Sequence, residues 1–214
     1  RNGVTIFLIE VPPGTRTLRW LRDDSPRPYG SGATYRDVKI ALPYQYFFVT
    51  LTPDAEVCQH QSVYFLNKQL MSLGEPLGEC HYYNCSVDSY GVHCWICVQY
   101  INSQLPAQVD PTPIDRAGMF VEWFFASSFN ASSEYHEGKS FWGKNRGQIG
   151  DPRVASINAW EQATVDRPEF ALEVQWKMSL TAEQVFKQLT PNKSSRPRNL
   201  EDLICAFREG DRRA

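Results

Sequence analysis

Chemically reactive side chains gather in two short segments near the middle of the chain. Residues 80–85 read Cys-His-Tyr-Tyr-Asn-Cys, and residues 93–97 read His-Cys-Trp-Ile-Cys. Four of the six cysteines and two of the four histidines therefore lie within eighteen residues. Thiolates and imidazoles bind zinc, and a thiolate is also a strong nucleophile. A metal centre and a catalytic cysteine are the two chemistries to compare.

A structural zinc centre would use four thiols, those of Cys80, Cys85, Cys94 and Cys97. The spacing argues against it, because residues 93–101 alternate like a β-strand and so place Cys94 and Cys97 on opposite faces. The two residues between them, Trp and Ile, do not form turns. We therefore predict no metal and expect most of these thiols to be small buried apolar side chains, with zinc as the alternative.

A nucleophilic cysteine must be partly exposed, deprotonated and close to a group that stabilises negative charge. Asn84 offers a side-chain amide that can donate a hydrogen bond to a developing oxyanion. The sequence therefore predicts Asn84 as a candidate oxyanion donor for a nearby cysteine, with Cys94 and Cys97 both left open at this point.

The elements expected before these residues are β-strands. Residues 5–11 are rich in β-branched and aromatic side chains, and a Pro-Pro-Gly turn leads to a hairpin partner at 16–22. Residues 38–51 are apolar on both alternating faces, which predicts a central strand covered on both sides, and 62–66 supply a fourth strand. Short connections favour an antiparallel meander over residues 3–66.

Helical patterns follow after residue 110. Thr112, Pro113 and Asp115 form a helix start, which predicts a helix over 113–128. Similar start signals and apolar stripes predict three further helices, at 153–164, 181–189 and 199–208. An alternating apolar pattern predicts one late strand at 170–178. The order predicts a single α+β domain over 1–214, with 1–110 mainly strands and a flap and 111–214 mainly helical.

This order of features resembles the ubiquitin-conjugating family. A meander, a flap containing Pro and Gly, His81-x-x-Asn84, Ile96-Cys97 and then helices follow one another as in that fold. The resemblance is to the divergent prokaryotic branch, which includes PRTRC system protein B. It implies a ubiquitin-conjugating-like fold, Cys97 as a thioester nucleophile, Asn84 as its oxyanion donor and a ubiquitin-like modifier as partner. The implied protein is either a cysteine-dependent acyl-transfer enzyme or a degenerate relative that has lost the chemistry.

A protein-interaction module is the second hypothesis. The segment 119–142 carries more large rings than one helix and its loop bury easily, so we expect Phe120, Trp123 and Phe125 to mediate self-association or partner binding. Binding by such a module needs no cofactor. An exposed anchor on this segment would favour the module, and an accessible Cys97 beside Asn84 would favour the enzyme.

Overall charge and apolar patterning limit the other partners. The 22 basic and 24 acidic residues give a formal net charge of −2, which provides no general attraction for nucleic acid or anionic lipid. Apolar runs are too short for a membrane-spanning helix. Sparse, unevenly placed cysteines predict reduced thiols and a cytoplasmic location.

Overall fold

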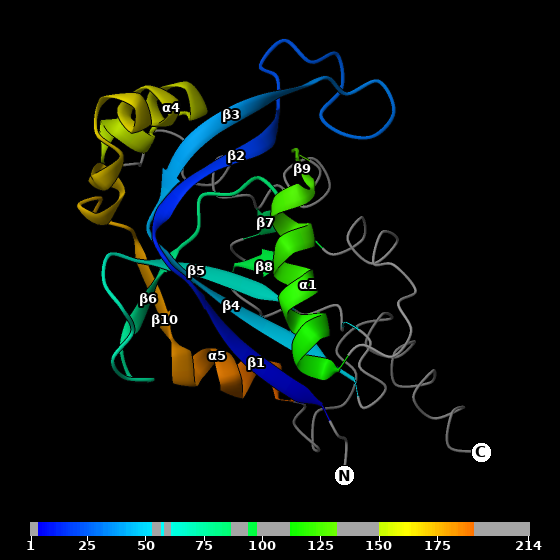
Figure 1. The fold of residues 1–214 in the computed structure, drawn as a ribbon, viewed down its shortest axis with the longest axis vertical. Coiled ribbons are helices and arrows are strands. Elements are labelled where there is room, and N and C mark those ends of the chain that lie inside the picture. The colour runs from blue at the N-terminus through cyan, green and yellow to red at the C-terminus, as the bar shows by residue number, and fades with distance from the viewer. Residues whose placement is uncertain are drawn as a thin grey trace.

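The computed structural model combines β-sheet with three α-helices among the residues it describes (Figure 1). The predicted α+β class is confirmed. None of the helices in the described part of the chain is both long and apolar enough to cross a membrane. The described residues are 4–52, 57, 61–86, 94–97, 112–131 and 150–190.

The larger sheet has β4 (Tyr44–Leu51) in its interior, between β1 (Thr5–Val11) and β5 (Ser62–Leu66). It continues through β6 (Pro76–Glu79) to β10 (Met178–Thr181). Two short strands extend it beside β5, namely β7 (Cys85–Ser86) and β8 (Trp95–Ile96). The smaller sheet has the order β3 (Tyr35–Leu42), β2 (Gly14–Leu21) and β9 (Ser128–Phe129).

The predicted hairpin between residues 5–11 and 16–22 is wrong, although both strands form. β1 pairs with β4, and β2 pairs with β3 in the other sheet. Pro12 and Pro13 explain the separation, because proline fixes φ near −65° and tight hairpin turns need positive φ. The four-stranded meander over residues 3–66 is therefore replaced by two sheets. β2 and β3 are sequential antiparallel neighbours in the smaller sheet, and β4, β5 and β6 follow one another in the larger sheet.

The predicted central strand 38–51 is two strands that meet at Pro43. β3 ends at Leu42 and β4 begins at Tyr44, each in its own sheet. Pro43 has no N–H to donate to a strand ladder, so the chain turns from one sheet into the other at this residue. The second half of the prediction holds, since β4 is an interior strand whose residues after Tyr44 are all buried.

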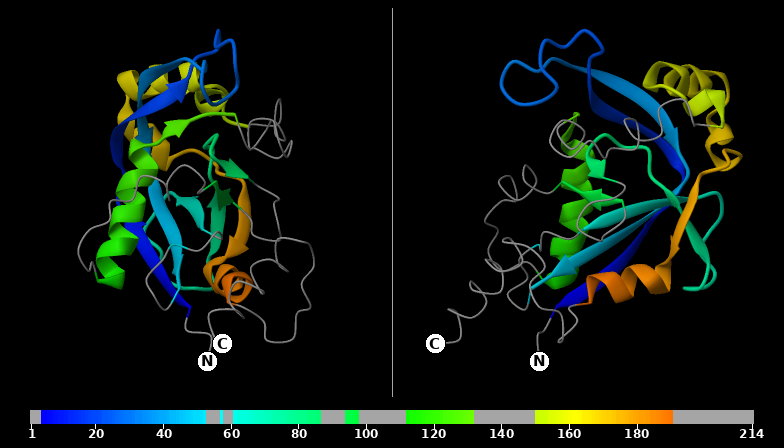
Figure 2. Two further views of the ribbon diagram at one scale, coloured as in Figure 1. Left: turned by 90° about the vertical axis from the view of Figure 1, so that its right-hand side faces the viewer. Right: turned by 180° about the vertical axis from the view of Figure 1, so that it is seen from behind.

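Two helices cover opposite faces of the larger sheet. Phe47 packs against Phe124 of α1 (Pro113–Ala126), with ring centroids 5.3 Å apart. The next residue, Phe48, points to the other face and packs against Phe186 of α5 (Ala182–Leu189), with centroids 5.1 Å apart. Figure 2 shows α1 and α5 on opposite sides of these strands. The two faces of β4 are therefore buried by elements from distant parts of the sequence.

A third helix, α4 (Ile157–Asp166), closes the outer edge of β3 (Figure 1). The Ala41 N–H donates to Oγ1 of Thr164 (2.8 Å), and Nε1 of Trp160 donates to the Ala41 carbonyl (2.7 Å). The Lys39 N–H donates to Oε1 of Glu161 (3.2 Å). Side chains of α4 thus take the place of a neighbouring strand, which protects an otherwise unpaired edge.

The predicted starts of the helices at 113 and 181 are confirmed, and the predicted start at 153 is not. Thr112 and Asp115 form a capping box at the start of α1, and Thr181 and Gln184 form another before α5. The predicted helix 153–164 divides into a 3₁₀-turn at Pro152–Val154 and the later α4. The predicted helix 199–208 lies outside the described residues.

The predicted late strand 170–178 is wrong. Pro168–Leu172 form a 3₁₀-helix, and the strand begins only at Met178. Phe170, Val174 and Trp176 are buried in this irregular segment, so their apolar spacing reflects core contacts rather than a pleated strand. Buried side chains from the strands and the helices form one hydrophobic cluster.

Candidate functional site

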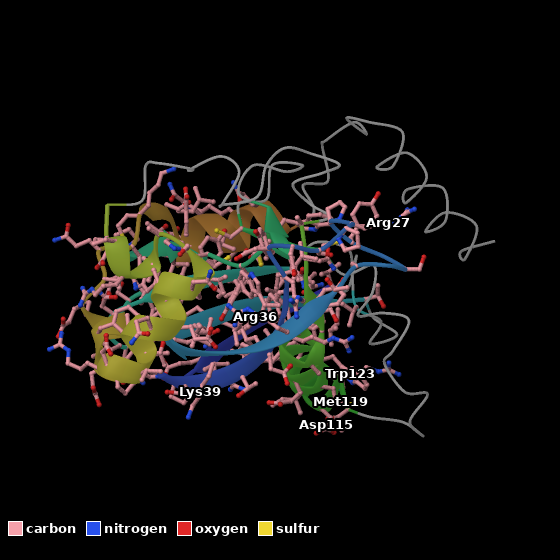
Figure 3. The ribbon with its side chains drawn as sticks, turned by 90° about the horizontal axis from the view of Figure 1, so that it is seen from above. Arg27, Arg36, Lys39, Asp115, Met119 and Trp123 are labelled. Carbon is pink, nitrogen blue, oxygen red and sulfur yellow. The ribbon has the colours of Figure 1, made fainter. Side chains whose placement is uncertain are left out.

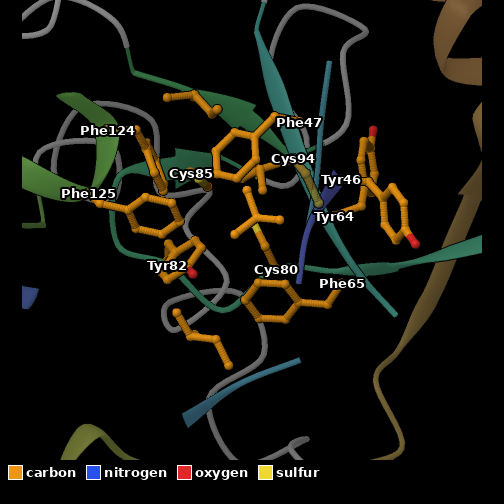
Figure 4. Close-up of a cluster of buried hydrophobic side chains, with 14 of the residues drawn as sticks. Tyr46, Phe47, Tyr64, Phe65, Cys80, Tyr82, Cys85, Cys94, Phe124 and Phe125 are labelled. Atoms are coloured by element: carbon orange, nitrogen blue, oxygen red, sulfur yellow. The ribbon is translucent and has the colours of Figure 1, made fainter. Parts of the chain in front are cut away.

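Three of the candidate cysteines meet in the core. Cys80 follows β6, Cys85 begins β7 and Cys94 precedes β8, and all three are fully buried. The thiol of Cys80 makes side-chain hydrogen bonds with the thiols of both others. Figure 4 shows the three cysteines surrounded by large rings, those of Phe47, Tyr64, Phe65, Tyr82 and Phe124. The predicted burial of most of these thiols is confirmed.

Burial makes the thiols of Cys80 and Cys85 unreactive. It raises the pKa of Cys80 well above the usual value for a thiol, and it also raises the pKa of Cys85. Both therefore stay protonated at neutral pH, and a protonated thiol is a poor nucleophile. Within the ranges that the structure describes, which include all four cysteines of the zinc hypothesis, no group of three or more His, Cys, Asp or Glu residues is arranged to hold a metal ion.

Cys97 and Asn84 are neighbours, as the sequence predicts. The strand pairing places Cys85 opposite Ile96, and one step further the Cys97 N–H donates to the Asn84 carbonyl oxygen at 2.9 Å. Cys94 and Ile96 are buried, whereas Cys97 is partly exposed. Among the four cysteines described, Cys97 is therefore the thiol most accessible from solvent.

The Asn84 side chain is engaged elsewhere. Its Nδ2 donates to Oγ of Ser127 and to the Ser128 carbonyl, both at 3.2 Å, and its Oδ1 accepts from the Asn130 N–H at 2.9 Å. These contacts join the start of β7 to the segment that follows α1. Both amide N–H groups are used in them, so in this arrangement neither is left to stabilise an oxyanion at Cys97.

His81 lies in an aromatic environment in the core. Its ring centroid is 4.9 Å from that of Trp176, 6.1 Å from Trp160 and 6.4 Å from Phe65. This burial lowers the pKa of His81 well below its usual range, so the imidazole is neutral at pH 7. In the sequence His81 marks the family pattern, and in the structure it packs as a core side chain.

Two buried polar contacts carry no sequence signal. The side-chain amide of Gln61 accepts from the Thr50 N–H at 2.6 Å and donates to the Thr50 carbonyl at 2.8 Å. The Tyr82 hydroxyl donates to Oε1 of Gln45 at 2.5 Å. Glutamine is usually a surface residue, so the sequence does not indicate either role. That Gln61 pairs with the main chain of β4, and that Gln45 accepts from a buried hydroxyl, is evident only once the strands are paired.

The aromatic residues of α1 are mostly in the core, which corrects the predicted interface. Phe120 is fully buried, and Phe125 is only 8% exposed. The Arg16 guanidinium lies 4.0 Å from the centre of the Phe125 ring, and Phe47 packs edge-to-face against the same ring. The two sheets together provide a larger receiving surface than one face of a small sheet. Only part of the predicted segment is described, because residues 132–149 lie outside the described residues.

Trp123 lies on the flank of α1, where it packs against the hydrophobic cluster and keeps part of its surface accessible. It is partly exposed, as is Met119 one turn earlier, and Ile114 is 68% exposed. Figure 3 shows Asp115, Met119 and Trp123 following one another along the helix. This outer stripe of α1, made of Asp115, Met119 and Trp123, carries the accessible part of the predicted aromatic interface.

Comparisons with protein-family models, with curated proteins and with solved structures find no match to this chain.

Proposed function

We propose that this chain is a non-enzymatic protein-interaction module, a degenerate relative of the ubiquitin-conjugating family. The observation that carries the proposal is the engagement of both Asn84 amide N–H groups by Ser127 and Ser128. An acyl-transfer site needs a donor aimed at the developing oxyanion, and this amide is held in another direction. The β4–β5–β6 meander followed by Asn84, Cys97 and α1 supports the distant relationship.

The binding surface in this proposal is the outer stripe of α1. Trp123 combines a large apolar surface with an indole N–H, the combination that makes tryptophan a frequent binding anchor. Met119 beside it is a flexible apolar side chain suited to varied partners. The thiols of Cys80, Cys85, Cys94 and Cys97 are not joined in disulfide bonds, which suits a reducing, cytoplasmic compartment.

Quantitative affinity capture tests the binding surface. The full chain, Trp123→Ala and a control, Val165→Ala, serve as baits. Val165 is 73% exposed on α4, so its truncation removes a similar kind of apolar surface from a different helix. We expect proteins that bind the native chain and the control to be lost from Trp123→Ala, while a cooperative melt shows that this variant remains folded at the assay temperature. Equal recovery by all three baits would contradict the proposed surface.

A cysteine-dependent conjugating enzyme is the second candidate, favoured by the partial exposure of Cys97 next to Asn84. Its partner would be a ubiquitin-like modifier that the thiol accepts as a thioester. Intact-mass analysis after incubation with an activating enzyme, ATP and a modifier separates the candidates. The interaction module predicts no mass increase. A modifier adduct that forms on the native chain and is absent from Cys97→Ala would establish the enzyme.

A further inference from the structure

The outer edge strands of the two sheets differ in how their main-chain groups are covered. The outer edge of β3 is closed by side chains of α4, through Thr164, Trp160 and Glu161. Among the described strands β1 pairs with β4 alone, so it is an edge strand of that part of the structure. In the part of the chain that the structure describes, no strand or helix forms main-chain hydrogen bonds with the other edge of β1. An unpaired edge presents a row of N–H and C=O groups to an incoming strand.

The pairing identifies which groups point outward. The N–H and C=O of Thr50 both bind the Gln61 side chain, on the β5 side of β4. Ile6 stands opposite Thr50, and opposed residues in an antiparallel pair direct their main-chain groups either toward or away from each other. The groups of Ile6 therefore point away from β4, and alternation gives the same direction for Leu8 and Glu10.

The composition of β1 suits pairing with a second strand. Its sequence, TIFLIEV, has no proline, glycine or lysine, the residues that usually block edge pairing. Residues 6–9 are apolar and only partly buried. A seven-residue strand of this kind, with high β-propensity and one charge, is a template for another extended segment.

We propose that β1 is the site at which a second copy of this chain pairs, antiparallel and with its two-fold axis at Leu8. This register matches the whole strand, because Leu8 faces Leu8 and Ile6 faces Glu10 of the second copy. Each of the three outward-facing pairs exchanges two main-chain hydrogen bonds. The strand is compatible with a second copy of itself, because this register never places the only charge on the strand, at Glu10, opposite a like charge. The Glu10 carboxylate accepts hydrogen bonds from Tyr46 and Gln69 of its own chain.

The dimer makes one continuous sheet from the two larger sheets. A two-fold axis perpendicular to the sheet keeps both α1 helices on one face and both α5 helices on the other, as each helix already covers one face of β4. A single pair of short strands is a small interface, so the dimer is weak and depends on concentration. It goes beyond the proposed function, because it uses an element other than the outer stripe of α1.

Sedimentation velocity of the full chain over a concentration series tests the proposal. We expect a reversible monomer–dimer equilibrium. Leu8→Lys places two ammonium groups opposite each other at the axis and weakens the dimer by about tenfold or more, because like charges directly opposite are destabilising. Ile6→Lys places an ammonium opposite Glu10 of the second copy, so the dimer is retained or tightened. Trp123→Ala leaves the equilibrium unchanged, which separates this proposal from the proposed function.

Three results would overturn the proposal. The native chain remains a monomer at every concentration; a folded Leu8→Lys dimerises like the native chain; or both lysine variants weaken association equally, which indicates another register or another occupant. Hydrogen exchange of the native chain provides a measurement that needs no variant. The amides of Ile6, Leu8 and Glu10 become more protected as concentration rises if the strands pair, and their protection is independent of concentration if they do not.

Discussion

A methyl group added at Gly78 should destabilise the fold, because this residue stands where three elements meet. Gly78 lies in β6, opposite Phe65 of β5 on one side and Met178 of β10 on the other. Trp176 packs directly over it. An added Cβ would lie 2.7 Å from the Cβ of Trp176 and 2.9 Å from the Phe65 carbonyl oxygen. Both distances are shorter than any ordinary contact of a Cβ atom.

Neither neighbour moves easily. The Cβ of Trp176 is the root of a buried side chain that also packs on Phe65 and His81, and the Phe65 oxygen belongs to a strand. Overpacking of this kind costs about 1–3 kcal/mol. The reduced freedom of the unfolded chain offsets about 0.4–1 kcal/mol of that cost. We therefore expect Gly78→Ala to lose about 1–2 kcal/mol, which lowers Tm by about 2–8 °C for a chain of this length.

Urea unfolding followed by tryptophan fluorescence measures the effect. Gly14→Ala is the matched control, because Gly14 begins β2 and a Cβ there meets nothing within 4 Å. We expect the control to lie within about 0.5 kcal/mol of the native chain, as surface substitutions usually do. If Gly78→Ala proves as stable as Gly14→Ala, with the same m-value, the close packing of Trp176 against β6 is refuted.

Three further changes have expected results. Gly118→Ala should stabilise the fold by about 0.5–1 kcal/mol in a thermal melt, because Gly118 is an exposed residue inside α1 with open space for a Cβ. Because burial lowers the pKa of His81 below its usual 6.5, the unfolded state binds more protons below that pH. The contribution of His81 to stability is complete above pH 6.5. Below that pH the free energy of unfolding falls by about 1.4 kcal/mol per pH unit until the pH reaches the folded-state pKa. Urea titrations at several pH values should show this slope in the native chain and a smaller slope in His81→Leu. Asn84→Ala should cost about 1–3 kcal/mol by the same urea assay because it removes three internal hydrogen bonds, and Cys97→Ala, which removes only a partly exposed thiol, should cost less.

Local signals in the sequence were sufficient to predict several of the secondary-structure elements. The start of α1 depends on Thr112, Pro113 and Asp115, which are adjacent in the chain, so the boundary could be predicted without knowing the fold. Strand pairing could not be predicted in this way, because β1 pairs with a strand that lies some forty residues further along the chain. Pro12-Pro13 and Pro43 mark the first two transitions between the sheets. Their effect is physically clear once the geometry of a tight turn is considered.

The candidate site was only partly predictable for the same reason. A family pattern was sufficient to place Cys97 beside Asn84. The Asn84 amide donates its hydrogen bonds to Ser127 and Ser128, which lie 43 and 44 residues away, and no local sequence pattern predicts these contacts. Likewise, the burial of Phe125 depends on Arg16 and Phe47, which belong to two different sheets.

The closure of the β3 edge by α4 has a consequence for the timing of synthesis. The Ala41 N–H has no α4 partner until Thr164, which follows it by 123 residues, has been synthesised. At translation rates of about 5–20 residues per second, roughly 6–25 s pass between the appearance of the strand and that of the helix. During this interval a nascent chain carries an uncovered strand edge that can pair with neighbouring chains on the same messenger. Slower elongation between these two segments should therefore increase aggregation during synthesis without altering the stability of the finished protein.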